Sequence, residues 1–274
     1  MLDDKIILGW NALMNTACSK AFMATGNERY KQLAISNMQF LLEKFSERNS
    51  NGFFHTWKNE TAKYPAFLDD YAFLVQALIH LQEISSDTKW LTRAKDIAEF
   101  VIDNFSEEET GFFYFTKASQ QDVIIRKKEV YDGAVPSGNS IMACNLYQLS
   151  ILFDQAAWKD KVLNMTGSLV RAISQYPTSF GIWACLFQEI LYDTLEIAIV
   201  GNDHESLKTE LFEHYLPHRV LMTTDIEGQS FALLAGKAVK EKSQVYLCKG
   251  HSCQQPVDSI ERFMSLIDSS EKVN

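Results

Sequence analysis

Hydrophobic and polar residues recur along the first 190 residues with the spacing of helices, and the segments come in pairs. Three segments carry apolar residues at steps of three and four with charges between them, which is typical of amphipathic helices; they are 27–45, 87–105 and 155–173. Each follows a nearly uncharged segment, whose apolar residues on all sides predict a helix covered by protein; these are 11–25, 70–85 and 139–154. The unit is therefore a helical hairpin with an inner and an outer helix.

The hairpins are copies of one repeat. Asn27–Phe45 aligns with Asp87–Phe105, so that Phe45 falls on Phe105. A long loop with the sequence Gly-Phe-Phe follows each of these two helices, at 52–54 and 111–113. Hairpins side by side close most simply into an (α/α) toroid, with the long loops gathered at one mouth. A straight solenoid is the alternative, but its usual repeats of about 33–47 residues are shorter than this one.

The pattern changes near residue 190. Residues 180–191 predict a last inner helix, and a shorter α/β pattern follows it. The predicted elements are strands at 195–200, 219–223 and 245–248 and helices at 203–215 and 259–267. We therefore expect a mainly α protein with two parts, a partial toroid over 1–191 and a small α/β appendage over 192–274.

Three hairpins make half of a six-hairpin ring, which would leave one apolar face of the inner helices in water. We therefore expect either that the chain is the C-terminal part of a longer protein or that it forms a homodimer across that face.

Composition and charge exclude several classes of function. The chain has 274 residues, 46% of them hydrophobic and 22% charged, as in an ordinary globular protein. Its net charge of -9 would repel a phosphate backbone, so no nucleic-acid partner is expected. No apolar run reaches the ~18 residues of a membrane span, and acidic residues follow Met1 where a signal peptide has basic ones. We expect a cytoplasmic protein without a membrane contact.

Short polar residues recur where the inner helices begin, at Asn11, Asp70 and Asn139. Helix capping alone is one explanation of Asp69, Ser137 and Asn139. The other is a carbohydrate cleft, because sugars are held by carboxylates, amides and aromatic faces. Asp70 and Asp132 are then the candidate general acid and base, with Glu189 as a third candidate carboxylate.

Further residues are expected to line this cleft. The candidate substrate contacts are Trp10, Asn11, His55, Asp69, Tyr71, Ser137 and Asn139. The aromatic residues expected around the mouth are Trp10, Phe53, Phe54, Trp57, Tyr64, Tyr71, Phe112, Phe113 and Tyr131. His80 belongs to an inner helix but comes late in it, so we expect a hydrogen-bonded histidine at the far end of the toroid.

Several of these segments resemble one known family. They are Trp10-Asn11, Leu68-Asp69-Asp70-Tyr71-Ala72, Asp132-Gly133-Ala134-Val135-Pro136-Ser137-Gly138-Asn139 and Cys248…Cys253-x-x-Pro256. Together they are similar to the C-terminal half of the thioredoxin-domain-containing, spermatogenesis-associated protein family. The resemblance implies a six-hairpin glycosidase-like barrel akin to N-acylglucosamine 2-epimerases, preceded by a thioredoxin-like domain. It also implies that a missing half-barrel and that domain are partners of this chain.

The five cysteines do not form a disulfide scaffold and fit a reducing cytoplasm. Cys18, Cys144 and Cys185 lie among apolar residues and are expected to be buried. Cys248 and Cys253 have three interpretations: free thiols in a surface turn, a reversible disulfide, or zinc ligands together with His251. The resemblance to a family with a thioredoxin-like domain adds weight to a redox role.

Two functions remain in competition. The first is a carbohydrate-related enzyme, either a glycoside hydrolase or a sugar isomerase or epimerase, with a sugar substrate at the mouth. The second is a non-catalytic helical scaffold that binds protein. No dinucleotide loop, P-loop or His-Glu-x-x-His is present, so neither cofactor nor metal is predicted.

Overall fold

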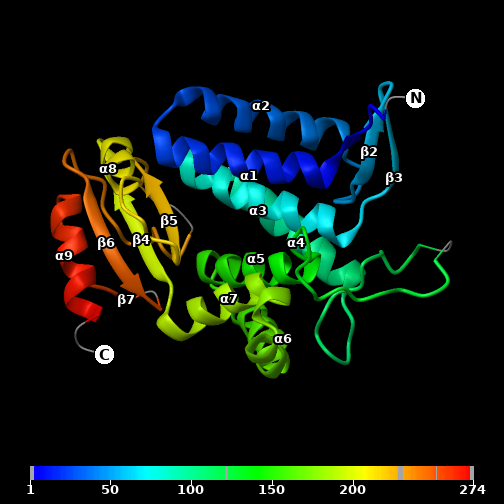
Figure 1. Ribbon diagram of the computed structural model, residues 1–274. Coiled ribbons are helices and arrows are strands. Elements are labelled where there is room, and N and C mark those ends of the chain that lie inside the picture. Colours follow the sequence, from blue (N-terminus) through cyan, green and yellow to red (C-terminus); the bar gives the residue numbers. More distant parts are fainter. Residues whose placement is uncertain (1–2, 121–122, 228–230, 251, 272–274) are drawn as a thin grey trace.

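A computed structural model describes residues 3–120, 123–227, 231–250 and 252–271. Its first part is a partial (α/α) barrel, in which each inner helix contacts the next and the first three carry an outer helix on their backs (Figure 1). The inner helices are α1 (Leu8–Thr25), α3 (Leu68–Ser85), α5 (Gly138–Leu152) and α7 (Gly181–Tyr192), and the outer ones are α2 (Glu28–Lys44), α4 (Lys89–Phe105) and α6 (Ala156–Gln175). The predicted hairpins and the toroidal fold class are confirmed.

Burial follows the predicted division between inner and outer helices. α3 and α5 are buried on almost every side, whereas α4 buries one face through residues such as Leu91, Ala94 and Val101. α1 and α7 are the exceptions among the inner helices, because Trp10 and Met14 of α1 are 69% and 64% exposed and Leu191 of α7 is 61% exposed. The first inner helix therefore lies at an open edge of the partial barrel.

A small sheet lies beside the helix N-termini and was not predicted. It pairs β2 (Phe54–Lys58) with β1 (Ile6–Ile7) on one side and with β3 (Thr61–Pro65) on the other, all antiparallel. The turn between β2 and β3 has positive φ angles at Asn59 and Glu60, of 49° and 55°, as a two-residue hairpin turn requires. Asn-Glu is not the usual Asn-Gly signal, which is why the sequence does not reveal it.

The second part of the chain is an α/β unit. A mixed sheet has the order β5-β4-β6-β7, with β4 and β5 parallel and the other pairs antiparallel. Its elements are β4 (Leu195–Val200), α8 (His204–Leu211), β5 (Arg219–Thr224), β6 (Gln244–Lys249), β7 (Ser252–Cys253) and α9 (Ile260–Glu271). The strands and last helix agree with prediction, while α8 ends four residues earlier than expected.

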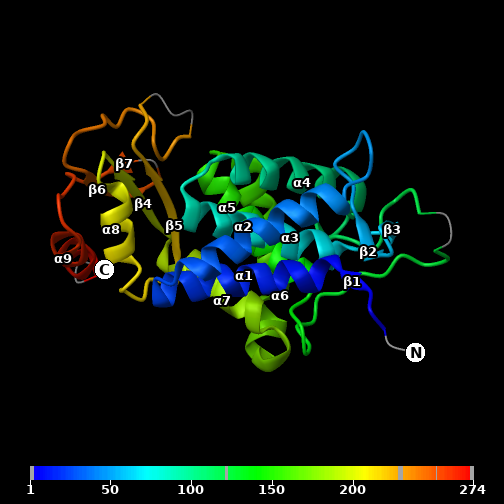
Figure 2. The same cartoon turned by 90° about the horizontal axis from the view of Figure 1, so that it is seen from above.

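The two faces of this sheet have different partners, because successive side chains of a strand point to opposite sides. Ala198 and Val200 pack in the same cluster as the barrel helices. Ile197 and Ile199 pack with α8 and α9, where Phe263 is fully buried. The sheet thus stands against the end of the barrel, with α9 on its outer side (Figures 1 and 2).

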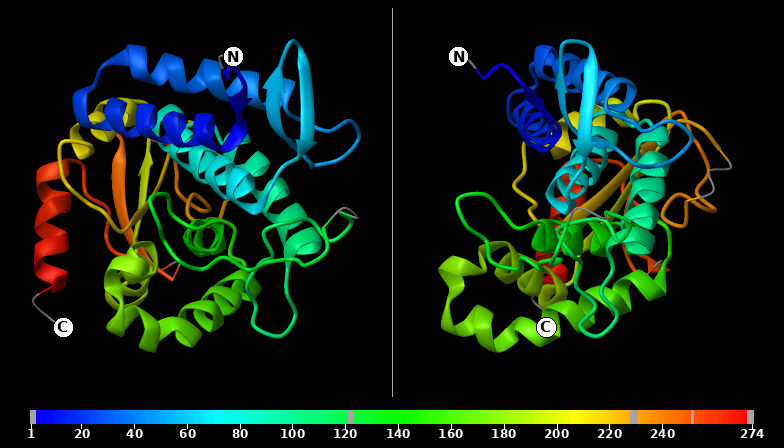
Figure 3. Two further views of the ribbon diagram at one scale, coloured as in Figure 1. Left: turned by 45° about the vertical axis from the view of Figure 1, so that its right-hand side comes forward. Right: turned by 90° about the vertical axis from the view of Figure 1, so that its right-hand side faces the viewer.

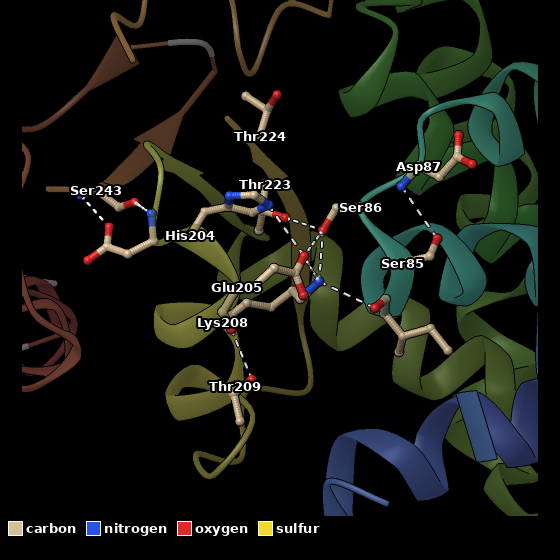
Figure 4. A network of polar contacts seen from close by, with 12 residues as sticks. Ser85, Ser86, Asp87, His204, Glu205, Lys208, Thr209, Thr223, Thr224 and Ser243 are labelled. Atoms are coloured by element: carbon tan, nitrogen blue, oxygen red, sulfur yellow. Dashed lines mark hydrogen bonds and ion pairs between the residues drawn. The ribbon is translucent and has the colours of Figure 1, made fainter. Parts of the chain in front are cut away.

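A buried lysine fastens the α/β unit to the barrel (Figure 4). Lys208 of α8 is 1% exposed, and its Nζ donates to Glu205 Oε1 at 2.6 Å and Ser86 Oγ at 2.7 Å. It also donates to the carbonyl of Ile84 at 3.3 Å, and the Ser86 hydroxyl bonds the hydroxyl of Thr223 at 2.6 Å. The C-terminus of α3 is thereby joined to α8 and β5, where a cation also suits the negative end of the helix dipole.

We expect Lys208→Ala to lower the free energy of unfolding by about 2–3 kcal/mol, because it leaves buried acceptors without their donor. Urea denaturation at pH 7 measures this loss. The control is Lys44→Ala, an exposed lysine of α2, for which a change within about 0.5 kcal/mol is expected. Equal losses in the two variants would contradict a structural role of Lys208.

The cysteines differ in part from expectation. Cys248 and Cys253 are joined by a disulfide between β6 and β7, and Cys248 is buried, so two free thiols in a surface turn is the wrong interpretation. His251 lies outside the described residues. A redox role for the pair stays a prediction. Cys18 and Cys144 are half-buried, whereas Cys185 is exposed and was wrongly expected in the core.

No helix within the described ranges combines the length and apolar character that crossing a bilayer requires.

Candidate functional site

Two consecutive aspartates at the start of α3 reach in different directions. Asp70 Oδ1 accepts the backbone N–H of Gly9 at the start of α1, at 2.9 Å. Asp69 Oδ1 accepts the N–H of Gly138 at the start of α5, also at 2.9 Å. The first N–H groups of a helix have no partner inside it and form its positive end, so carboxylates bind them well. The aspartates therefore tie three inner helices together at the mouth.

The N–H groups that donate to these two aspartates belong to glycines, Gly9 and Gly138, for a steric reason. A Cβ added at Gly138 would lie 2.4 Å from Asp69 Oδ1 and 2.9 Å from Leu68 Cγ. The carboxylate approaches the backbone of α5 so closely that no side chain fits there.

Asp70 also holds a histidine. Its Oδ2 accepts from Nδ1 of His55, on β2, at 2.7 Å and from the N–H of Phe67 at 2.9 Å, and the residue is 3% exposed. Because a carboxylate only accepts, the His55 proton resides on Nδ1, and Nε2 is free to accept or, when charged, to donate. The hydrogen bond to Asp70 raises the pKa of His55, although burial acts in the opposite direction.

Asp69 is a carboxyl group at the mouth whose pKa is raised. Burial raises its pKa to about 6, and the charges of Asp70 and Glu129 add to the rise, while the bond from Gly138 opposes it. Its second oxygen, Oδ2, receives no hydrogen bond from the described residues. A carboxyl group that is half protonated near pH 6 can give or take a proton.

A pair of aromatic rings lies beside these groups. The ring of Phe67 stacks on Phe115, with centroids 4.7 Å apart and planes 14° apart, and meets the His55 ring edge-on at 4.9 Å. Both phenylalanines are half-buried. Sequence reasoning missed them, although Phe67 directly precedes Leu68-Asp69-Asp70 and Phe115 follows a Gly-Phe-Phe loop. Such flat faces are suited to the C–H side of a sugar.

Both carboxylate oxygens of Asp132 accept hydrogen bonds from other parts of the protein. Its Oδ1 accepts from Ser140 Oγ at 2.6 Å and from the N–H of Ser137 at 3.1 Å, and its Oδ2 accepts the N–H of Ile182, in α7, at 2.9 Å. Ser137, in turn, caps α5 by accepting the N–H of Ser140. Asp132 and Ser137 therefore shape the turn before α5 and join it to α7.

Tyr71 and Asn139 occupy equivalent places under the two Gly-Phe-Phe loops. The N–H of Phe53 donates to the Tyr71 hydroxyl at 2.9 Å, and that of Phe113 donates to Asn139 Oδ1 at 2.8 Å. Asn139 Nδ2 also donates to the carbonyls of Phe113 and Glu129. Both side chains are closed off from solvent. We therefore correct the expectation that Tyr71 and Asn139 contact substrate. Their side chains hold the two Gly-Phe-Phe loops in place by hydrogen bonds.

The remaining candidates are spread more widely. Trp10 is exposed on α1, and the neighbouring Asn11 is half-buried with its Nδ2 bonded to the carbonyl of Ile7. Glu189 lies in the last turns of α7, away from the mouth, where it accepts from Thr194 and burial raises its pKa to about 7. It is therefore not a mouth carboxylate. His80 bonds Glu83 near the far end of α3, as predicted.

The predicted ring of aromatic residues is wrong for four of its nine members, while Phe54 and Trp57 are half-buried. The side chains that belong to the core are Phe53, Tyr71, Phe112 and Phe113. Tyr64 and Tyr131 are exposed, as is Trp10. The Gly-Phe-Phe loops turn their rings inward, so that each loop is anchored by the core it covers.

Comparisons with known proteins agree with this fold. Residues 11–134 match the family model of N-acylglucosamine 2-epimerase. Over 93% of its length the chain is homologous to spermatogenesis-associated protein 20, with 26% identity to the rat and 24% to the human protein, and it covers 35% of each. The chain thus spans about a third of the length of these curated relatives.

Solved structures with the same architecture include carbohydrate-active enzymes. A cellobiose 2-epimerase from Bacillus thermoamylovorans superposes with a TM-score of 0.50 at 16% identity, over 60% of this chain and 44% of that one. A GH76 α-mannanase from Bacteroides thetaiotaomicron gives 0.51 at 14% identity, over 61% and 45%. An α-1,6-mannanase of Salegentibacter sp., in complex with α-1,6-mannotriose, gives 0.50 at 16% identity, over 60% and 47%. These likenesses show that the helical part of the chain has the (α/α)-barrel fold of those enzymes.

Proposed function

We propose that this chain belongs to a carbohydrate-active enzyme whose reacting carboxyl group is Asp69, with His55 as the second proton-transfer group and Asp70 holding it in place. The observation that carries the proposal is the state of Asp69, a carboxyl with a pKa of about 6 and a free oxygen at the mouth of the barrel. The stacked pair Phe67–Phe115 next to His55 supplies a face for a sugar ring.

The comparisons support the choice of Asp69 and Asp70. The Salegentibacter α-1,6-mannanase is described as inactive when two consecutive aspartates are replaced by asparagine. Here the consecutive Asp69 and Asp70 begin an inner helix of the same kind of barrel. We accordingly revise the acid–base pair expected from the sequence: Asp70 becomes a positioning residue, and Asp132 a brace of the turn before α5.

The chemistry follows from the protonation of the two groups. In hydrolysis, protonated Asp69 donates its proton to the leaving oxygen, which keeps it, and Asp69 is reprotonated from solvent. In epimerisation, Asp69 protonates the carbonyl oxygen and takes that proton back when the carbonyl re-forms, while C2 receives a solvent proton on its other face. His55 presents Nε2, because Asp70 keeps the proton on Nδ1 as a buried aspartate does for a catalytic histidine. In hydrolysis His55 would activate water, and in epimerisation it would remove the proton beside a sugar carbonyl.

Proton NMR in deuterium oxide tests the proposal and separates the two reactions. We expect cellobiose, α-1,6-mannobiose or N-acetylglucosamine to bind, and a substrate among them to be converted. Epimerisation places deuterium at C2 of the sugar, whereas hydrolysis releases a new reducing end and leaves C2 protonated. His55→Gln is expected to lower the rate by about 10²–10⁴-fold.

Asp160→Asn is the control, because Asp160 is an exposed carboxylate of α6. Its rate and sugar affinity should equal those of the wild type. Binding of none of the three sugars by folded protein would contradict the proposal and favour the protein-binding scaffold, which agrees with the use of Asp132 and Asn139 as braces.

A further inference from the structure

A cavity lies at the opposite end of the barrel from Asp69. It has a volume of about 580 Å³ and is enclosed by the C-terminal ends of α1, α3 and α5 and by the segment 212–221, which leads from α8 into β5. Figure 3 shows the α/β unit standing over these helix ends. The volume lies within the range of about 300–1,000 Å³ that is typical of small-molecule sites.

Two basic side chains in this cavity contact one buried carboxylate, and the charge of Lys20 also acts on it. Glu83 Oε2 lies 3.1 Å from Nδ1 of His80, and its Oε1 lies 3.6 Å from Nε of Arg219. Burial alone would raise the pKa of Glu83, but the charges of Arg219, His80 and Lys20 outweigh it and lower that pKa. Glu213, the other acidic residue of the lining, is exposed at the rim. The lining therefore has one buried pair, Arg219 with Glu83, and one charge of each sign at the rim, Lys20 and Glu213.

Arg219 has donors to spare. Its Nη1 donates to the carbonyl of Leu216 at 2.8 Å, and among the described residues its Nη2 meets only the sulfur of Met23, at 3.6 Å. The side chain is only 15% exposed, and its buried Nε makes no hydrogen bond with any described residue. A guanidinium has five N–H donors and normally finds oxygen acceptors for them when it is buried. An incoming carboxylate would supply two such acceptors in the right plane.

We propose that this cavity binds a small hydroxy-carboxylic acid, with its carboxylate between Arg219 and Lys20. The amides of Gln82 and Gln148, which also line the cavity, are suited to the hydroxyl groups of such a molecule. Met23, Ile79 and Leu152 give its carbon chain an apolar wall. Because Lys20 belongs to α1 and Arg219 to β5, the ligand contacts the barrel and the α/β unit together and stabilises their association.

Sodium gluconate and sorbitol form a matched pair of probes, since they have the same hydroxylated chain and differ at the carboxylate. We expect gluconate to raise the midpoint of thermal unfolding of the full chain, and sorbitol with sodium chloride at equal ionic strength to leave it unchanged. Calorimetric titration should show gluconate affinity about tenfold weaker in Lys20→Gln and in Arg219→Lys, which loses the planar fork. Lys44→Gln, an exposed lysine of α2, is the control with unchanged affinity.

Three results would overturn this assignment. They are equal shifts by gluconate and sorbitol, no shift by gluconate, and full gluconate affinity in Lys20→Gln, whose exposed side chain can be replaced without unfolding the protein. Asp69→Asn should keep its response to gluconate. That variant tests the gluconate cavity independently of the proposed sugar site at the mouth. A negative result for either proposal therefore leaves the other one standing.

Discussion

Replacing Asp70 by alanine is expected to lower the free energy of unfolding by about 3–5 kcal/mol. Three donors lose their acceptor at once, namely the N–H groups of Gly9 and Phe67 and the Nδ1–H of His55. An unsatisfied buried donor costs about 1–3 kcal/mol, and removal of one partner of a buried ion pair is of similar size. The substitution also frees the start of α1 from α3.

Urea denaturation at several pH values measures this loss and its cause. In the wild type the raised pKa of His55 stabilises the fold fully below the unfolded-state pKa of about 6.5, and this gain is lost as pH rises through the folded-state pKa. This pH dependence of the free energy of unfolding should disappear in Asp70→Ala. Asp160→Ala, at an exposed site, should change stability by less than about 0.5 kcal/mol. A loss below about 1 kcal/mol in Asp70→Ala would contradict the bracing role.

Asp69→Asn is expected to have the opposite effect on stability and to abolish activity. The pKa of Asp69 is about 6, above its ordinary value of 3.8, so the folded protein holds a proton that the unfolded chain releases first. Wild-type stability therefore falls as pH rises from about 4 to 6 and stays reduced above it. The side-chain amide of asparagine carries no charge that burial would penalise, and its oxygen can still accept the N–H of Gly138.

We expect Asp69→Asn to gain about 1–2 kcal/mol at pH 8, after allowance for partial exposure, and nothing at pH 4. The rate on any sugar found as substrate should fall about 10²–10⁴-fold. Stability gained together with activity lost is the signature of a group kept for function. A variant less stable than the wild type at pH 8 would show that Asp69 is a brace like Asp70.

Much of the fold could be predicted because its signals are local and repeated. The apolar period of α3 and α5, and the repeat that places Phe45 on Phe105, fix the hairpins without tertiary information. The β2–β3 hairpin was missed because its turn residues, Asn59 and Glu60, adopt positive φ without a glycine.

The site was harder to predict because adjacent residues of a helix point about 100° apart. Asp69 and Asp70 are the same residue type, yet one faces α5 and the other α1, and only the packing of three helices decides which is buried. Tyr71, one residue further, turns into the core, where it holds a loop. The sequence located the mouth but could not assign these three roles.

The most direct test is titration of the Asp69 side-chain carboxyl by carbon-13 NMR, with Asp69→Asn identifying its signal. We predict a midpoint near pH 6 in the free protein and a shift of that midpoint when a bound sugar covers Oδ2. A midpoint near the ordinary value of 3.8, unaffected by cellobiose, α-1,6-mannobiose or N-acetylglucosamine, would contradict the assignment of Asp69 as the reacting group of the barrel.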